Sequence, residues 1–104
     1  MLAARDEINQ LIEDLDDLEL FPDPLTLTPA HFAALELIEL GDTAFDFILE
    51  ALHHHPKRVV RGWAAWILGE MGDRRAIPAL TAAAHHDPYH YVRHEAQASL
   101  ALLR

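Results

Sequence analysis

The chain repeats itself at an interval of about 32 residues, and this periodicity limits the possible folds more than any other feature of the sequence. When the segment 56–68 is laid over the segment 88–100, residues of the same type align. The aligned pairs are Pro56 and Pro88, Val60 and Val92, Arg61 and Arg93, Ala64 and Ala96, and Leu68 and Leu100. Such intervals are typical of solenoids, in which each helical hairpin buries its apolar face only against its neighbours.

The segment before residue 56 carries the same pattern. An interval shorter by one position aligns Ala64, Ala65, Leu68, Glu70, Gly72 and Asp73 with Ala33, Ala34, Leu37, Glu39, Gly41 and Asp42. After this turn the first interval returns, and it aligns Ala44, Ala51, His53 and His54 with Ala76, Ala83, His85 and His86. One slipped residue in the connecting turn explains the change. We therefore divide the chain into repeats at 29–55, 56–87 and 88–104, of which the last is incomplete.

Composition and helix signals predict a single all-α domain. Hydrophobic residues make up 51% of the 104 residues, alanine and leucine dominate, and there are only 4 glycines. Residues 1–20 hold an amphipathic stretch that we interpret as an N-terminal capping helix, and residues 21–28 form a proline-containing linker. Thr28, followed by Pro29, restarts the helical pattern as an N-cap. The predicted helices, about six in all, cover residues 3–19, 29–40, 43–54, 56–71, 76–86 and 88–104.

The order of motifs within each unit resembles one known type of repeat. X-Pro, Val-Arg, Ala-Ala, Leu-Gly, Gly-Asp and Ala-Ile-Pro-x-Leu follow one another through residues 56–80, and this order resembles the HEAT-like repeat of the phycobilisome lyase type. The resemblance covers roughly residues 29–104 and is best over residues 56–88. It implies antiparallel helix pairs stacked into an α-solenoid, with the second helix of each pair on the concave face. It implies little about function, because such repeats serve as scaffolds, as adaptors and, less often, as enzyme frames.

The apolar spacing also predicts which side chains are buried. We expect the second helix to bury Phe32, Leu35 and Ile38 or their neighbours, and the fourth to leave Trp66 partly exposed. Asp87 is expected to cap the last helix. The basic residues that we interpret as a solvated rim are Lys57, Arg58 and Arg61.

Charge is distributed unevenly along the chain. Residues 1–52 contain thirteen acidic residues and a single base, Arg5, whereas residues 53–104 hold the other basic residues and only four acidic ones. The net charge of −9 disfavours nucleic acid as a partner, because phosphate contacts need clustered cations. No basic flank followed by an apolar run occurs near the start, so we expect no signal peptide, no membrane span and a cytoplasmic location. The absence of cysteine excludes disulfides and thiolate chemistry.

Two surfaces are candidates for binding a protein partner. The last helix is apolar nearly all round at its end and no polar capping repeat follows it, so we expect a second copy of the chain to cover it as a dimer. The other candidate is a shallow groove along the alanine-rich fifth helix, although close packing through the alanines explains the same residues. The candidate residues are Leu100, Leu102 and Leu103 at the C-terminal edge, Asp46, Glu50, Arg74 and Arg75 beside the groove, and Trp66.

The histidines are the first candidates for metal chemistry. The repeat interval places the pair of His53 and His54 beside the pair of His85 and His86, and neutral imidazoles suit zinc, nickel or copper. Asp87 is the only carboxylate spaced to complete this cluster, and we expect it to be occupied as a helix cap. The sequence therefore predicts no physiological metal site and no cofactor.

A histidine–glutamate pair is the second candidate. His94 and Glu95 resemble the His-Glu motif of deoxyhypusine hydroxylase, a HEAT-like enzyme that holds two irons and needs several such pairs. The matching positions of the other repeats hold Gly62, Trp63, His31 and Phe32. A di-iron site is therefore not expected, and Ser99, the only serine, offers little support for nucleophilic catalysis.

These observations predict a non-enzymatic module that binds or scaffolds other proteins. One alternative, implied by the resemblance, is an accessory protein for tetrapyrrole or phycobilin attachment, in which Trp63 and Trp66 contact the chromophore. A second alternative is a metal-binding protein related to deoxyhypusine hydroxylase. A spectral shift on mixing with bilin tests the first alternative, and the iron content after aerobic purification tests the second.

Overall fold

The computed structural model describes residues 5–16 and 28–104, and every regular element in these residues is a helix. This confirms the predicted all-α class. The elements are α1 (Arg5–Asp14), α2 (Pro29–Leu40), α3 (Asp42–His54), α4 (Arg58–Met71), the short 3₁₀ helix η1 (Arg74–Ala76), α5 (Ile77–His86) and α6 (His90–Leu103).

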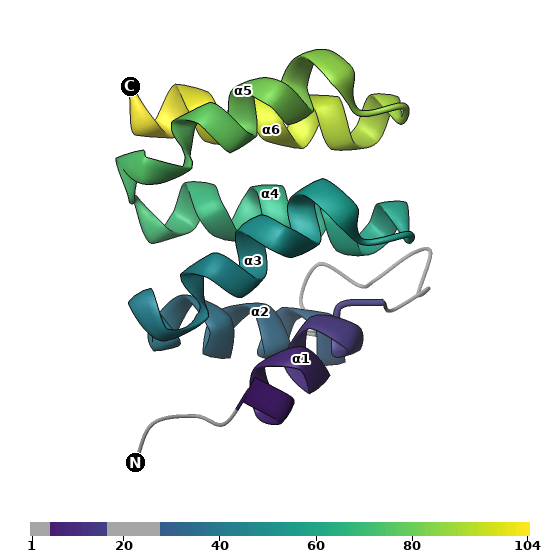
Figure 1. Cartoon of the computed structure of the whole chain (residues 1–104), viewed down its shortest axis with the longest axis vertical. Coiled ribbons are helices and arrows are strands. Elements are labelled where there is room, and N and C mark those ends of the chain that lie inside the picture. Colours follow the sequence, from purple (N-terminus) through teal and green to yellow (C-terminus); the bar gives the residue numbers. More distant parts are fainter. Residues whose placement is uncertain (1–4, 17–27) are drawn as a thin grey trace.

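The helices form two layers (Figure 1). In one layer α4 lies between α2 and α6, and in the other α3 lies between α1 and α5. Each helix of the first layer also packs against its partner in the second, since α2 contacts α1, α4 contacts α3, and α6 contacts α5. Successive helix pairs therefore stack side by side, but the packed pairs, α1 with α2, α3 with α4 and α5 with α6, are offset by one helix from the repeats at 29–55 and 56–87.

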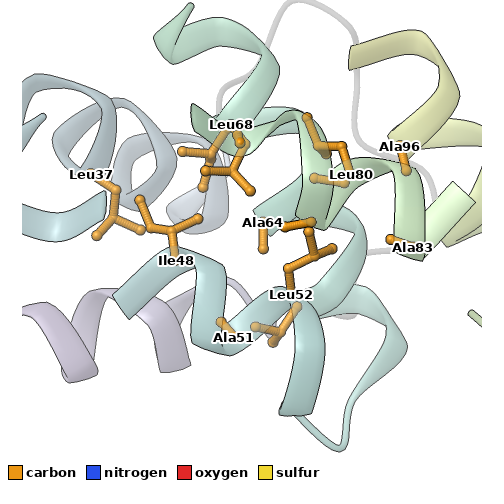
Figure 2. Close-up of a cluster of buried hydrophobic side chains, with 14 of the residues drawn as sticks. Leu37, Ile48, Ala51, Leu52, Ala64, Leu68, Leu80, Ala83 and Ala96 are labelled. Carbon is orange, nitrogen blue, oxygen red and sulfur yellow. The ribbon is translucent and has the colours of Figure 1, made fainter. Parts of the chain in front are cut away.

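The core lies between the two layers. Figure 2 shows Leu37 of α2, Ile48 and Leu52 of α3, Leu68 of α4 and Leu80 of α5 pointing into this space. Each of these side chains is almost completely buried, and burial of one such side chain stabilises a fold by about 1.5–3 kcal/mol. Their spacing of three or four residues along each helix puts them on one face, which is why the apolar pattern predicted the hairpins.

In α2 the buried face differs from the residues that we named first. Phe32 is 58% exposed and Leu35 is 46% exposed, so the expectation that these two side chains are buried is wrong. The neighbouring stripe is buried instead, and it consists of Ala30, Ala33, Ala34 and Leu37. Three alanines on this stripe allow α2 to approach the rest of the fold closely, and the two large residues remain on the outside.

The turns follow the sequence signals, with small shifts. Thr28 caps α2 as expected: its hydroxyl accepts a hydrogen bond from the backbone N–H of His31, and the His31 ring accepts one from the N–H of Thr28. Gly41 and Gly72 end α2 and α4 with φ of 55° and 69°, a conformation that favours glycine. The helices after Pro56 and Pro88 begin slightly later than expected, at Arg58 and His90.

Helix α1 is shorter than the predicted 3–19 and ends at Asp14. Ile8, Ile12 and Leu15 are buried as the apolar stripe predicts, while Leu18 and the linker prolines lie outside the described residues. Two ion pairs join this end of the chain to the turn before α4. The His55 ring lies 3.1 Å from a carboxylate oxygen of Glu13, and the Lys57 ammonium lies 2.7 Å from a carboxylate oxygen of Asp16. The hydrogen bond to Asp16 raises the pKa of Lys57.

Helices α4 and α6 approach each other over two glycines of α4. A Cβ atom at Gly62 would overlap the Tyr91 ring, and one at Gly69 would lie 2.7 Å from the Cβ and 3.0 Å from the Cα of Ser99. The buried Ser99 hydroxyl donates a 2.7 Å hydrogen bond to the carbonyl oxygen of Ala65. The seam between the two helices therefore has no room for larger side chains.

None of the helices within residues 5–16 and 28–104 is both long and apolar enough to cross a lipid bilayer.

The seam predicts the effect of adding one methyl group. We expect Gly69→Ala to destabilise the fold by about 1–3 kcal/mol, because the backbone of α6 must move away. This loss opposes the gain of about 1 kcal/mol that alanine has over glycine in a helix. Urea unfolding followed by circular dichroism measures the difference, with Gln97→Ala on the exposed side of α6 as the control. An unchanged or higher midpoint for Gly69→Ala would contradict the tight seam.

Candidate functional site

A buried ion pair joins the first helix of the second repeat to the turn at the end of the same repeat. Arg61 is only 7% exposed, which corrects its interpretation as part of a solvated rim. Its guanidinium donates to both carboxylate oxygens of Asp87, at 2.9 and 3.4 Å, and to the carbonyl oxygen of His55 at 2.9 Å. Asp87 also accepts from the N–H of Tyr89, the N-cap residue of α6. Asp87 is thus not the helix cap that we expected, because it lies before the N-cap position and its carboxylate holds Arg61.

The same arginine position recurs in the next repeat. Arg93 donates to the carbonyl oxygen of Asp87 at 2.7 Å. This hydrogen bond is equivalent to the one from Arg61 to the carbonyl oxygen of His55, because donor and acceptor both lie one repeat interval further along the chain. The recurrence of the Val-Arg pair after an X-Pro turn was the sequence signal for this role. A solvated arginine has no reason to return in register with the buried alanines and leucines.

The two histidine-bearing turns lie side by side, as the repeat interval predicts. His53, His55 and His86 line one open hollow of about 470 Å³ together with the Arg61–Asp87 pair. His54 lines a different hollow, beside α1, and the His85 ring contacts the carbonyl oxygen of Thr81 at 2.8 Å. In the described part of the chain, no three side chains of the metal-ligating types come close enough to hold one ion. The cluster of His53, His54, His85 and His86 is therefore not assembled as a metal site by these residues.

The groove along α5 is filled by its own packing. Ala79, Ala83 and Ala84 are buried, so the alanines serve close helix contact. Arg75 is bonded to Asp73 and Asp42, and its guanidinium lies 4.4 Å from the centre of the Phe45 ring. Its hydrogen bonds lower the pKa of Asp73 and raise that of Arg75 itself. The groove residues that remain exposed are Asp46, Glu50 and Arg74.

The C-terminal edge is less apolar than expected. Leu100 and Leu103 are 5% and 6% exposed because α6 packs against both α4 and α5, so their assignment to an exposed edge is wrong. Leu102 is 64% exposed and keeps its place as a candidate.

The largest concentration of exposed apolar side chains lies on the outer side of the first layer. On each helix of this layer one stripe points away from α1, α3 and α5. Tyr91 and Leu102 belong to the stripe of α6, and Trp66 is partly exposed on that of α4, as predicted. We call this surface the aromatic face and define it by Phe32, Leu35, Trp63, Trp66, Tyr91 and Leu102.

A hollow of about 190 Å³ lies within the aromatic face and is lined by His31, Trp63, Trp66, Tyr91 and Glu95. The indole rings of Trp63 and Trp66 stand at 90° to each other with centroids 5.5 Å apart. The His31 ring meets Trp63 edge-on, at 85° and 4.9 Å. Partial burial, with a smaller contribution from the negative charge of Glu95, raises the pKa of the Tyr91 phenol. We refer to this site as the aromatic hollow.

Sequence reasoning anticipated only part of the aromatic hollow. It named Trp66 as partly exposed but treated Glu95 and His94 as ordinary surface residues. His94 is exposed and stacks on His90 at 6.5 Å, whereas Glu95 is partly buried in the hollow. No local motif places Tyr91 there, because its position depends on the space above Gly62 of another helix.

Stacked antiparallel helices, in which Arg61 and Arg93 make equivalent hydrogen bonds one repeat apart, define an α-solenoid repeat protein. The chain belongs to the HEAT repeats, since that family matches residues 28–101. A comparison with curated proteins found no match.

The buried ion pair predicts a large effect of a small change. We expect Asp87→Asn to lower the free energy of unfolding by about 3–5 kcal/mol, because it leaves the Arg61 charge buried without a counter-ion. Urea unfolding measures this loss. Arg74→Gln, at an exposed arginine close in sequence, is the control and should change the stability by less than about 0.5 kcal/mol. A decrease in the free energy of unfolding no greater than that of the control would contradict this role of the Arg61–Asp87 pair.

Proposed function

We propose that this protein is a non-enzymatic interaction module that binds a partner protein through the aromatic face. HEAT repeats generally act as protein-interaction or scaffold modules, which gives the class of function. The observation that carries the proposal is the gathering of partly exposed aromatic and apolar side chains on one side of α2, α4 and α6. Large exposed apolar patches with polar surroundings mark binding surfaces in soluble proteins.

The composition of the aromatic face supports a protein as the ligand. Tryptophan and tyrosine are enriched at binding hot spots because each contributes a large contact area with few rotatable bonds. Here two tryptophans and a tyrosine lie together at the centre, with Phe32 and Leu35 on α2 on one side and Leu102 on α6 on the other. Exposed acidic residues of the same stripes, Glu39 and Glu70, provide a polar rim.

The other predicted surfaces support a partner less well. In the α5 groove the alanines are buried by helix packing, and Arg75 already forms ion pairs with two carboxylates. At the C-terminal edge only Leu102 of the three candidate leucines is exposed, and it belongs to the aromatic face. The exposed charges Asp46, Glu50 and Arg74 remain available for contacts on the opposite layer.

The alternatives implied by the phycobilisome lyase and hydroxylase resemblances have less support. The aromatic hollow, at about 190 Å³, is smaller than the clefts of about 300–1,000 Å³ that hold drug-sized ligands, and a tetrapyrrole is larger still. For the hydroxylase, the His94–Glu95 pair has no second pair beside it in residues 5–16 and 28–104. A module that binds protein is therefore the function that the arrangement of side chains supports best.

Selection of binding peptides tests the proposal. Random peptides displayed on phage are selected on the immobilised full chain, and the enriched peptides are then measured in solution. We expect the double variant Phe32→Ser with Leu35→Ser to weaken their binding by at least about tenfold, because it removes exposed contact area without opening the core.

The matched control is Asp46→Asn with Glu50→Gln on the opposite layer, which should leave the affinity within about twofold. Circular dichroism confirms that both variants fold. If the control loses binding while the Ser variant keeps it, the binding surface lies on the α3–α5 layer, and the assignment of binding to the aromatic face is wrong.

A second copy of the chain is one partner that we also propose. Self-association through α6 would depend on Leu102, since Leu100 and Leu103 are buried within the chain. In sedimentation velocity at micromolar concentration we expect a dimer for the wild type and a monomer for Leu102→Lys. Gln97→Lys, on another side of the same helix, should leave the dimer intact. A wild type that sediments only as the 11.7 kDa species would contradict self-association.

A further inference from the structure

We propose that the aromatic hollow binds the ammonium group of a lysine side chain, unmodified or methylated, on the partner protein. The inference rests on the proposed function, because it names the chemistry that the centre of the aromatic face recognises. The repeat pattern does not account for the hollow. The positions of α2 that correspond to Trp63 and Trp66 hold Phe32 and Leu35, and these two side chains are exposed.

The aromatic rings around the hollow are placed to contact a cation. A cation is attracted to the negative face of an aromatic ring, most strongly to tryptophan, within about 6 Å of the ring centre. Trp63 and Trp66 stand at 90° with centroids 5.5 Å apart, so a small group in the corner between them contacts both rings. Tyr91 lines the same hollow from α6. Rings on several sides suit a compact ammonium head group better than a flat guanidinium, which stacks on a single ring face.

The hollow also carries a negative charge. Glu95 lines the hollow one helical turn after Tyr91 and is partly buried. Among the described residues, no lysine, arginine or histidine side chain forms an ion pair with it. Burial is the main cause of the raised pKa of the Tyr91 phenol, and the negative charge of Glu95 raises it further. A carboxylate among aromatic rings, in a chain of net charge −9, complements a cation and disfavours an anion.

The hollow is small and its walls are rigid. A volume of about 190 Å³ is too small for a drug-sized ligand, yet it exceeds the roughly 30 Å³ share of one water molecule several times. The hollow thus matches the head group of one side chain, whose stem can leave through the open side. Its walls are held in place, since His31 is fixed by the cap with Thr28 and Tyr91 lies over Gly62. Binding therefore requires little ordering of the protein.

The chain offers a direct reporter for this site. Trp63 and Trp66 are its only tryptophans, so the tryptophan fluorescence comes entirely from the hollow. The probes are N-acetyl-trimethyllysine amide, N-acetyl-lysine amide, choline, and the neutral analogue of the first probe with a tert-butyl group in place of trimethylammonium. Each is titrated at constant ionic strength into the millimolar range, where a single head group is expected to bind.

We expect saturable fluorescence changes with both lysine probes. The neutral analogue, of the same shape, should bind about 3- to 30-fold more weakly because it lacks the attraction to the rings. Glu95→Gln keeps the size of the side chain and should weaken the binding of the trimethyllysine probe about 3- to 10-fold. Glu7→Gln, an exposed carboxylate on α1 outside the aromatic face, is the matched control and should leave binding unchanged.

Three results would overturn the inference. Equal binding of the charged and neutral probes would show an apolar pocket, and the absence of any change in tryptophan fluorescence would show no site. Choline binding as tightly as the lysine probes would assign the hollow to a free small molecule. The selected peptides separate this inference from the proposed function: if they need Phe32 and Leu35 but contain no lysine and tolerate Glu95→Gln, the aromatic face binds protein and only the lysine assignment fails.

Discussion

The arrangement of this protein depends on small residues where the helices of the first layer meet. The two glycines of α4 beneath α6 have no room for a side chain, and Ala33 and Ala34 on α2 and Ala64 on α4 are buried. Because the interior of a protein is as densely packed as a crystal of small molecules, any larger residue on these helices must point either into the core or outward. Leu37, Leu68 and Leu100 take the core. The tryptophans, Tyr91, Phe32, Leu35 and Leu102 are left partly or largely on the outside. The aromatic face is thus a consequence of how the repeats stack.

The buried Arg61–Asp87 pair gives this packing a defined geometry. Apolar contacts are not directional, whereas a guanidinium bound to two carboxylate oxygens and a backbone carbonyl fixes the position of one turn against the next. Such a pair adds little net stability compared with apolar residues of similar size, so a role in specifying the stacking is the better physical account of it. The same residues form the base of the hollow between the histidine-bearing turns, where the charge of Arg61 is already neutralised.

The two layers therefore differ in what they offer to a ligand. The layer of α1, α3 and α5 exposes separate charges, Arg75 on this layer is engaged within the chain, and its hollow of about 470 Å³ is lined by histidines and the Arg61–Asp87 pair. The layer of α2, α4 and α6 exposes aromatic rings around a small hollow with one carboxylate. Contact area together with a directional charge is the combination that gives both affinity and selectivity, which is why we propose this layer as the binding surface.

The sequence alone determined the repeat, the class of fold and the positions of most helices. The repeat interval, the helix caps and the glycine turns are local signals, and residues such as Ile48, Leu52 and Leu68 share a face wherever a helix forms. The sequence did not determine which of the two apolar stripes of α2 faces the core. It also did not determine whether Arg61 is solvated or buried in an ion pair. Both depend on residues that are distant along the chain: the packing around the buried alanines in the first case and the Asp87 carboxylate, at the far end of the same repeat, in the second. The aromatic hollow belongs entirely to the tertiary structure, because His31, Trp63 and Tyr91 come from three helices that meet only when the hairpins stack.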